Sequence, residues 1–161
     1  MSDVLCIYYS RSGKTKQAME EIAQALNAEL VEITDGEDRS GFKGFMRSGM
    51  EAMRRSTRPL KPYELQRGLE EYRLVVIGTP VWAGRCSSVV RAFLKRRGLE
   101  MKRVAYLLTR DSDKHYEEVY EQMDQYVSAP PGHTLPGATA QLHSSPEVTG
   151  KVAAKWSVPL S

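Results

Sequence analysis

The sequence predicts an α/β fold in which helices cover both faces of a doubly wound parallel sheet. Short apolar runs alternate five times with segments whose apolar residues recur at helical spacing, a pattern typical of this class. The length of 161 residues and the hydrophobic content of 41% suffice for one full core. We therefore expect a single domain over residues 1–161, without an internal repeat or linker.

The first half of the chain begins with the apolar run Val4–Tyr9, which is bounded by polar residues and predicts a buried parallel strand. A helix is expected from about Lys14. Its apolar face would consist of Ala18, Met19, Ile22, Ala23 and Leu26. Glu29–Ile33 predicts the second strand. An inserted basic amphipathic helix at about 41–56 follows, and two prolines beyond it start an irregular connection.

The second half contains the clearest strand, Leu74–Ile77, which ends at Gly78. The next helix has an apolar face of Val89, Val90, Phe93 and Leu94. Three basic residues followed by Gly98 suit the C-terminus of that helix. Val104–Leu108 predicts the fourth strand. A further helix would bury Val119, Tyr120, Met123 and Tyr126.

The last part of the chain gives weaker signals. A Pro/Gly-rich loop is expected over residues 128–136, and Ala138–His143 predicts a weak fifth strand. Ser145-Pro146 is a suitable start for a final helix. The buried side of that helix would consist of Val148, Val152 and Trp156.

Several features of the whole chain limit its function class. Met1-Ser2-Asp3 carries an acid where a signal peptide carries basic residues, and no apolar run approaches the roughly 20 residues of a membrane span. Cys6 and Cys86 give no disulfide framework, so we expect a cytoplasmic location. A buried, unreactive Cys86 is the simpler expectation. The three histidines are widely separated, and no metal-binding spacing is present.

A segment after the first strand lies where parallel α/β sheets bind ligands, at their carboxyl edge. It consists of Ser10, Arg11, Ser12, Gly13, Lys14 and Thr15. Gly13 lets the backbone approach a ligand closely, and three hydroxyl side chains offer donors. The helix that begins near Lys14 presents free N–H groups and the positive end of its dipole. Together these features favour a phosphate site.

Two other interpretations of the same segment compete with this one. Ser12-Gly13-Lys14-Thr15 is also the end of a Walker nucleotide motif, but that motif requires glycine at position 8, which is Tyr8 within the strand. Alternatively, Ser12 only caps the helix.

The segment Tyr9–Thr15 resembles the Ser/Thr-x-Ser/Thr-Gly-x-Thr phosphate loop of flavodoxins, in the same place after the first strand. Leu69–Gly84 is similar to the third strand and first flavin-contacting loop of that family. The two matches occur in the right order, and the resemblance extends over nearly the whole chain. It implies a flavodoxin-like three-layer sandwich of the short-chain type. It also implies a five-stranded sheet in the order 2-1-3-4-5 and noncovalently bound FMN.

Two loops are expected to contact the isoalloxazine ring of FMN, a large aromatic plane that needs apolar faces. The first consists of Thr79, Pro80, Val81, Trp82, Ala83 and Gly84. In this loop Trp82 offers a stacking face, Pro80 stiffens the turn and Gly84 leaves room. The alternative for Trp82 is packing on the surface beside the next helix.

The second ring loop should follow the fourth strand, with Thr109, Asp111 and Ser112 as the expected contacts. It is charged where flavodoxins often have glycine and an aromatic residue, and Tyr116 is its only ring. Capping of the following helix is therefore an equally open role for this loop.

The inserted helix lies in a strongly basic segment. Seven Lys or Arg residues between Arg39 and Lys61 face a single acid, Glu51. The apolar face of the helix would consist of Phe42, Phe45, Met46, Met50 and Met53. One expectation is a helix packed beside the sheet with its charged side in solvent. The other is that the charges attract an acidic protein, a membrane surface, RNA or an anionic molecule such as a nicotinamide dinucleotide.

The resemblance implies an FMN-binding redox protein that carries electrons or reduces a small acceptor such as a quinone. Its partners would be a redox protein, or NAD(P)H and a small acceptor, and a homodimer is compatible with the sequence. If catalytic, it would be an NAD(P)H:acceptor oxidoreductase. The alternative is a flavin-free module that uses its basic helix for a partner or for nucleic acid. The phosphate loop favours the first hypothesis.

Overall fold

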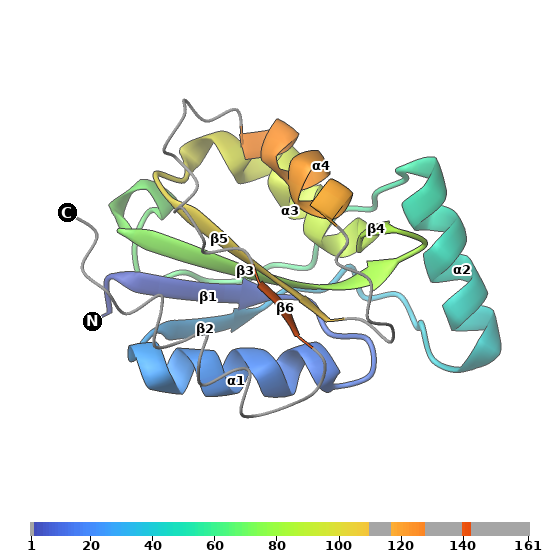
Figure 1. Cartoon of the computed structure of the whole chain (residues 1–161), viewed down its shortest axis with the longest axis horizontal. Coiled ribbons are helices and arrows are strands. Elements are labelled where there is room, and N and C mark those ends of the chain that lie inside the picture. The colour runs from blue at the N-terminus through green and yellow to red at the C-terminus, as the bar shows by residue number, and fades with distance from the viewer. Residues whose placement is uncertain (1, 110–116, 128–139, 143–161) are drawn as a thin grey trace.

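Five strands form the central parallel sheet, in the order β2-β1-β3-β5-β6 (Figure 1). This is the computed structural model of the chain, and it describes residues 2–109, 117–127 and 140–142. The strands are β1 (Val4–Tyr8), β2 (Glu29–Glu32), β3 (Leu74–Trp82), β5 (Val104–Thr109) and β6 (Ala140–Leu142). The predicted doubly wound α/β fold and strand order are confirmed, since every neighbouring pair in this order is parallel.

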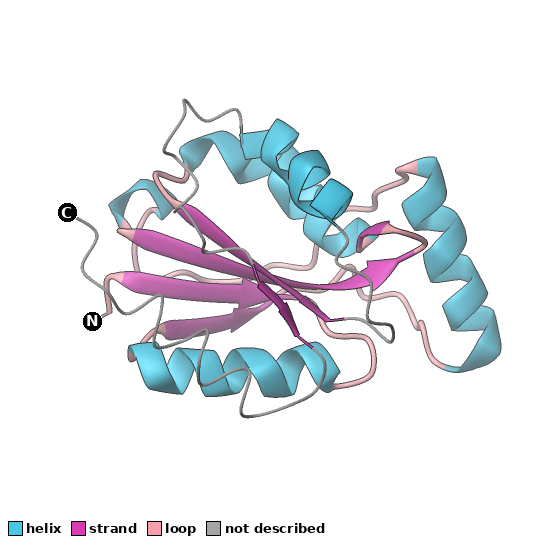
Figure 2. Ribbon diagram, in the orientation of Figure 1, coloured by secondary structure: helices cyan, strands magenta, loops and turns pink. Residues whose placement is uncertain are grey.

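Helices cover the two faces of the sheet (Figure 2). One face is covered by α1 (Lys14–Leu26), and the other by α3 (Ser88–Arg97) and α4 (Glu117–Val127). Short 3₁₀ turns, η1 (Leu69–Glu71) and η2 (Gly98–Glu100), precede β3 and follow α3. Alternate residues of β1 pack into two separate apolar cores, one on each face of the sheet, because successive strand residues point to opposite faces. None of the described helices is long and apolar enough to cross a membrane.

The expected turn at Thr79–Gly84 is not a loop, because β3 continues through it to Trp82. There the chain reverses into a short antiparallel strand, β4 (Arg85–Cys86), with Trp82 opposite Arg85. The two residues of this hairpin turn, Ala83 and Gly84, have φ angles of 50° and 73°, as a type I′ turn requires. A Cβ on Gly84 would meet no atom within 4 Å. Its left-handed backbone angle is therefore a reason of its own for glycine at this position, besides the room for a ligand that the sequence suggests.

The glycine after α3 also has a different role from the expected one. Gly98 has a right-handed φ of −58°, so it is not the left-handed cap that often ends a helix. A Cβ at this position would instead overlap the carbonyl oxygen of Tyr126 in α4. Gly98 thus allows two helices to approach closely. The predicted final helix from Ser145 lies outside the described residues.

The inserted helix α2 (Gly41–Arg54) lies beyond the carboxyl ends of the strands, next to the β3–β4 hairpin (Figure 1). Its Phe/Met face is not its packing face, contrary to what its amphipathic pattern suggests. Its buried residues are Gly44, Ser48 and Ala52. Phe42, Phe45, Met46, Met50 and Met53 are 45–77% exposed. At Gly44 no side chain fits, because a Cβ there would overlap the backbone of Arg39, which immediately precedes the N-cap of this helix.

Candidate functional site

A cavity of about 480 Å³ lies at the carboxyl edge of the sheet, under α2. Four parts of the chain line it: the segment after β1 with the start of α1, one side of α2, the end of β3 and the end of β5. Its size is within the range of small-molecule and cofactor sites. The lining residues are Arg11, Ser12, Lys14, Thr15, Phe45, Met46, Ser48, Gly49, Met50, Met53, Pro80, Val81, Trp82, Ala83 and Thr109.

The predicted phosphate loop ends at the N-terminus of α1 in a form suited to an anion. Gly13 is the N-cap residue, with a φ of 98°, and as a glycine it has no side chain that could accept a hydrogen bond from the first turn of the helix. The Ser10 hydroxyl accepts from the Gly13 N–H (3.0 Å), which tightens the loop, while Ser12 is exposed and does not cap. The first-turn N–H groups therefore have no side-chain cap, and a phosphate is a natural partner for them.

Arg11 of the same loop is held by the start of α2. Its Nε donates to the Arg39 carbonyl (2.9 Å) and its Nη2 donates to the Gly41 carbonyl (3.0 Å). Its guanidinium also lies 5.6 Å from the ring centre of Phe45. Arg11 thus joins the loop to α2, and only part of its hydrogen-bonding capacity is left for a ligand.

Trp82 forms the apolar wall at the end of β3. Only 8% of this residue is exposed, so it does not merely pack on the surface, the alternative considered for it. The Tyr9 ring meets it edge-on at 5.6 Å, and the Arg39 guanidinium lies over it at 5.1 Å from the ring centre. Both neighbours fix the plane of the indole.

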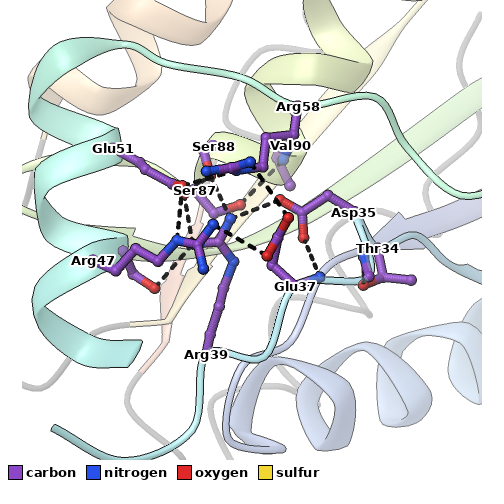
Figure 3. A network of polar contacts seen from close by, with 12 residues as sticks. Thr34, Asp35, Glu37, Arg39, Arg47, Glu51, Arg58, Ser87, Ser88 and Val90 are labelled. Carbon is purple, nitrogen blue, oxygen red and sulfur yellow. Dashed lines mark hydrogen bonds and ion pairs between the residues drawn. The ribbon is translucent and has the colours of Figure 1, made fainter. Parts of the chain in front are cut away.

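Arg39 is the centre of a buried polar network that holds α2 in place (Figure 3). Its guanidinium pairs with Asp35 at 2.6 Å and with Glu51 at 2.7 Å, and it also donates to the Ser48 and Ser88 hydroxyls. The Arg39 and Asp35 side chains are each 1% exposed. Loss of one partner would leave a buried charge uncompensated, so the network couples α2 firmly to the rest of the chain.

Acidic residues neutralise part of the basic segment. Arg47 and Arg58 each pair with both Glu37 and Glu51, at distances of 3.1–3.4 Å. Burial acts to raise the pKa of Glu51, but hydrogen bonds from Arg39, Arg58 and Arg47 outweigh it and lower that pKa. Because Asp35 and Glu37 lie just outside the segment counted in the sequence, the helix surface is less basic than that count indicates.

The predicted site residues are not all at the cavity wall. Nine of them line it, and Ser10, Gly13, Thr79 and Gly84 do not. Thr79 is fully buried, and its hydroxyl accepts from the Ser87 N–H (2.9 Å) at the start of α3. Asp111 and Ser112 lie outside the described residues.

Sequence reasoning missed the contribution of α2 to this wall. Six residues of the helix line the cavity: Phe45, Met46, Ser48, Gly49, Met50 and Met53. The Phe/Met pattern was the available signal, but it predicted packing onto the sheet. Cys86 is buried, which raises the pKa of its thiol to about 11, so it is not a reactive thiolate. Within the described ranges, no group of three or more His, Cys, Asp or Glu side chains could hold a metal ion.

Comparisons with known proteins agree with this geometry. The family model for flavodoxin matches residues 3–144. A structure from Bacteroides eggerthii, assigned as a flavoprotein, has a TM-score of 0.73 at 17% identity, with 98% of each chain covered. A flavoprotein from Lactobacillus acidophilus in complex with FMN has a TM-score of 0.65 at 18% identity, covering 89% of this chain and 91% of the other. Oxidised flavodoxin 2 from Bacillus cereus has a TM-score of 0.58 at 18% identity, with coverages of 96% and 94%. No curated protein matches the chain.

Proposed function

The chain belongs to the flavodoxin family, and on that basis we propose that it binds FMN noncovalently in the cavity under α2 and acts as a redox protein. The observation that carries this proposal is the N-terminus of α1, where Gly13 leaves the first turn without a side-chain cap beside an apolar cavity. FMN needs an anion site for its phosphate and an aromatic slot for its ring, and this arrangement offers both. The structure from Lactobacillus acidophilus named above is such an FMN complex.

The donors of this chain fit the phosphate end of FMN. The first-turn N–H groups of α1, the hydroxyls of Ser12 and Thr15, and the Lys14 ammonium would hold it. The apolar residues at the end of β3 and the Phe/Met side of α2 would hold the ring and exclude water from it. When bound, FMN supplies electron-transfer chemistry, and the protein sets its environment.

The donor and acceptor of the electrons form the finer part of the proposal. We favour NAD(P)H or an acidic redox protein as donor, because α2 leaves Lys43, Arg54 and Arg55 exposed near the cavity. A small molecule such as a quinone would serve as acceptor, since Phe45, Met50 and Met53 offer exposed apolar contacts at the cavity wall. The alternative of a flavin-free binding module gains no support from α2. The helix lines one side of the expected FMN cavity and leaves about 480 Å³ of it open.

Titration of the flavin-free protein with FMN and with riboflavin tests the proposal. Because riboflavin lacks the phosphate, we expect FMN to bind at least tenfold more tightly, as about 1.4 kcal/mol from charge-assisted hydrogen bonds would give. Equal affinities would show that the N-terminus of α1 does not hold the phosphate.

A further inference from the structure

A second, more open groove of about 630 Å³ lies along the outer side of α2. Met46 and Met50 line both this groove and the cavity under α2, so these two side chains separate them. Phe42 lines only the groove, and Phe45 lines only the cavity. The two sites therefore use neighbouring rows of one helix, since residues four apart share a row.

The groove is lined by an apolar row of α2 and, beside it, by the charged row Lys43, Arg47 and Glu51. Phe42, Met46 and Met50 follow one another at four-residue spacing and form its apolar wall. Arg54 continues this row at its C-terminal end, where Ser56, Thr57 and Arg58 also line the groove. The end of the groove at Arg54 thus carries cations and hydroxyls, and the remainder carries exposed phenyl and thioether groups next to the charged row.

The positive charge at that end is only partly compensated. Arg58 is paired with Glu37 and Glu51. Arg54 has no ion-pair partner among the described residues. Its helix position also places it at the negative end of the α2 dipole, which stabilises the cation without neutralising it for a ligand in solution.

We propose that this groove binds an apolar anion, namely a molecule with an aromatic body and one acidic group. The aromatic body lies against Phe42, Met46 and Met50, where ring and sulfur contacts are favourable. The acidic group lies at Arg54, within the hydroxyl-bearing end of the groove. Binding at the groove stands on its own residues. Met46 and Met50 line both sites, so a molecule bound in the groove would lie next to the FMN cavity. That this molecule accepts electrons from the flavin rests on the proposed function.

Other occupants fit the residues less well. Two copies of the chain joined through this face would bury Arg54, which has no ion-pair partner among the described residues, and burying an unpaired charge is costly. A dinucleotide carries two phosphates and two riboses, and the row Phe42, Met46 and Met50 offers these groups no polar partner. The row beside it includes the Glu51 carboxylate, which would repel a phosphate. An apolar anion satisfies both parts of the groove at once.

Calorimetric titration with 2-naphthoate and 2-naphthamide tests the proposal, because the two ligands share a ring system and differ in charge. We expect naphthoate to bind about two- to fivefold more tightly, the factor at the stronger end of the range for one exposed ion pair. The measurement is made without FMN and again with FMN in excess. The predicted site residues for FMN do not include Phe42 or Arg54. If the protein does not bind FMN, the affinities of the two naphthalene ligands can therefore still be compared.

Two matched pairs of variants locate the site. Arg54→Gln should abolish the preference for naphthoate, and Arg55→Gln, which removes the same charge one residue further on, should keep it. Phe42→Ser should weaken the binding of both ligands, and Phe45→Ser should leave their affinities unchanged. Equal affinities of the two ligands, or losses in Phe45→Ser in place of Phe42→Ser, would overturn the proposal. Tighter binding of NADP⁺ than of naphthoate, or a dimer that Phe42→Ser dissociates, would also overturn it.

Discussion

The hydroxyl oxygens of Thr15 and Thr109 lie 2.7 Å apart and share a buried hydrogen bond. Thr15 belongs to the first turn of α1, and Thr109 is the last residue of β5. The bond therefore fastens the expected phosphate loop to the strand end from which the expected second ring loop continues. Either hydroxyl can be the donor, and the one that accepts keeps its own O–H to donate to a ligand or to the backbone.

Replacing Thr15 by valine should cost about 1–3 kcal/mol of the free energy of unfolding, because the Thr109 hydroxyl is then buried without its partner. Thr109→Val breaks the same bond from the other side and should cost a similar amount. Only Thr15→Val should also weaken FMN binding relative to riboflavin, since Thr15 lies at the N-terminus of α1. Urea unfolding and flavin titration of both variants measure the two effects. Equal FMN affinities in the two variants would remove Thr15 from the phosphate site.

Trp82 should be the main source of fluorescence quenching when FMN binds. It lines the cavity, and Arg39 and Tyr9 hold its ring in place. Comparing wild type with Trp82→Phe separates its signal from that of Trp156. We expect most of the quenching to disappear in the variant. Quenching of the same depth in both proteins would place the flavin away from Trp82.

Ala83→Gly should stabilise the protein by about 0.5–1 kcal/mol. Ala83 has a φ of 50°, where glycine avoids the strain of a side chain, although part of the gain is lost to the greater freedom of glycine in the unfolded chain. Gly84→Ala is the matched control. It should destabilise the hairpin, because its φ of 73° is equally left-handed. Thermal melting distinguishes the two directions, and a lower melting temperature for Ala83→Gly would contradict this account.

Reversing Arg54 and Arg55 to Glu should leave FMN affinity nearly unchanged, because neither residue lines the cavity. The change should slow reduction by an anionic donor such as NADPH several-fold at low salt. At higher salt the difference should fade, since charges are screened over about 10 Å at 0.1 M ionic strength. Stopped-flow reduction at two ionic strengths measures this. Identical rates at low salt would show that α2 does not attract the donor.

Glu51 should make the anchoring of α2 depend on pH. Its folded-state pKa is lowered, so the stability it contributes is present above its ordinary value of 4.5 and is lost as the pH falls through the folded value. Glu51→Gln should therefore cost about 1–3 kcal/mol at pH 7, the range for hydrogen bonds to a charged group. The cost should shrink as the pH falls below 4.5. Urea unfolding of both proteins at several pH values is the measurement, and a cost that does not change with pH would contradict the role of the carboxylate.

Strong local patterns predicted the strands and placed the segment Ser10–Thr15 directly after β1, whereas the strand order was implied by the resemblance to flavodoxins. The prediction from sequence failed at the end of β3. Pro80 was read as part of a turn, since proline cannot donate to a sheet. In the structure, Gly78 is the last β3 residue that pairs with β1. Pro80 comes two residues later, so its missing N–H breaks no pairing with that strand.

The prediction of which face of α2 is buried was wrong for a different physical reason. Periodicity identifies the strongest hydrophobic stripe and assumes that burial follows it. In α2 the buried stripe is Gly44, Ser48 and Ala52, whose side chains are too small to contribute much to such a pattern. Contacts distant in sequence decided the outcome, including the hydrogen bond from the buried Arg91 of α3 to the Ala52 carbonyl (3.1 Å). No local rule reveals such a partner.

In α2, one set of residues attaches the helix and another set faces outward, and this separation affects how the sequence could change in evolution. The attachment of α2 depends on small residues and buried arginines, and its outward side chains contribute little to that attachment. Changes at Phe42, Phe45 or Met53, which are 59–77% exposed, should therefore be nearly neutral for folding. These positions could therefore change in evolution while the fold stays the same. Related chains could bind different ligands after a few substitutions on the outer side of this one helix.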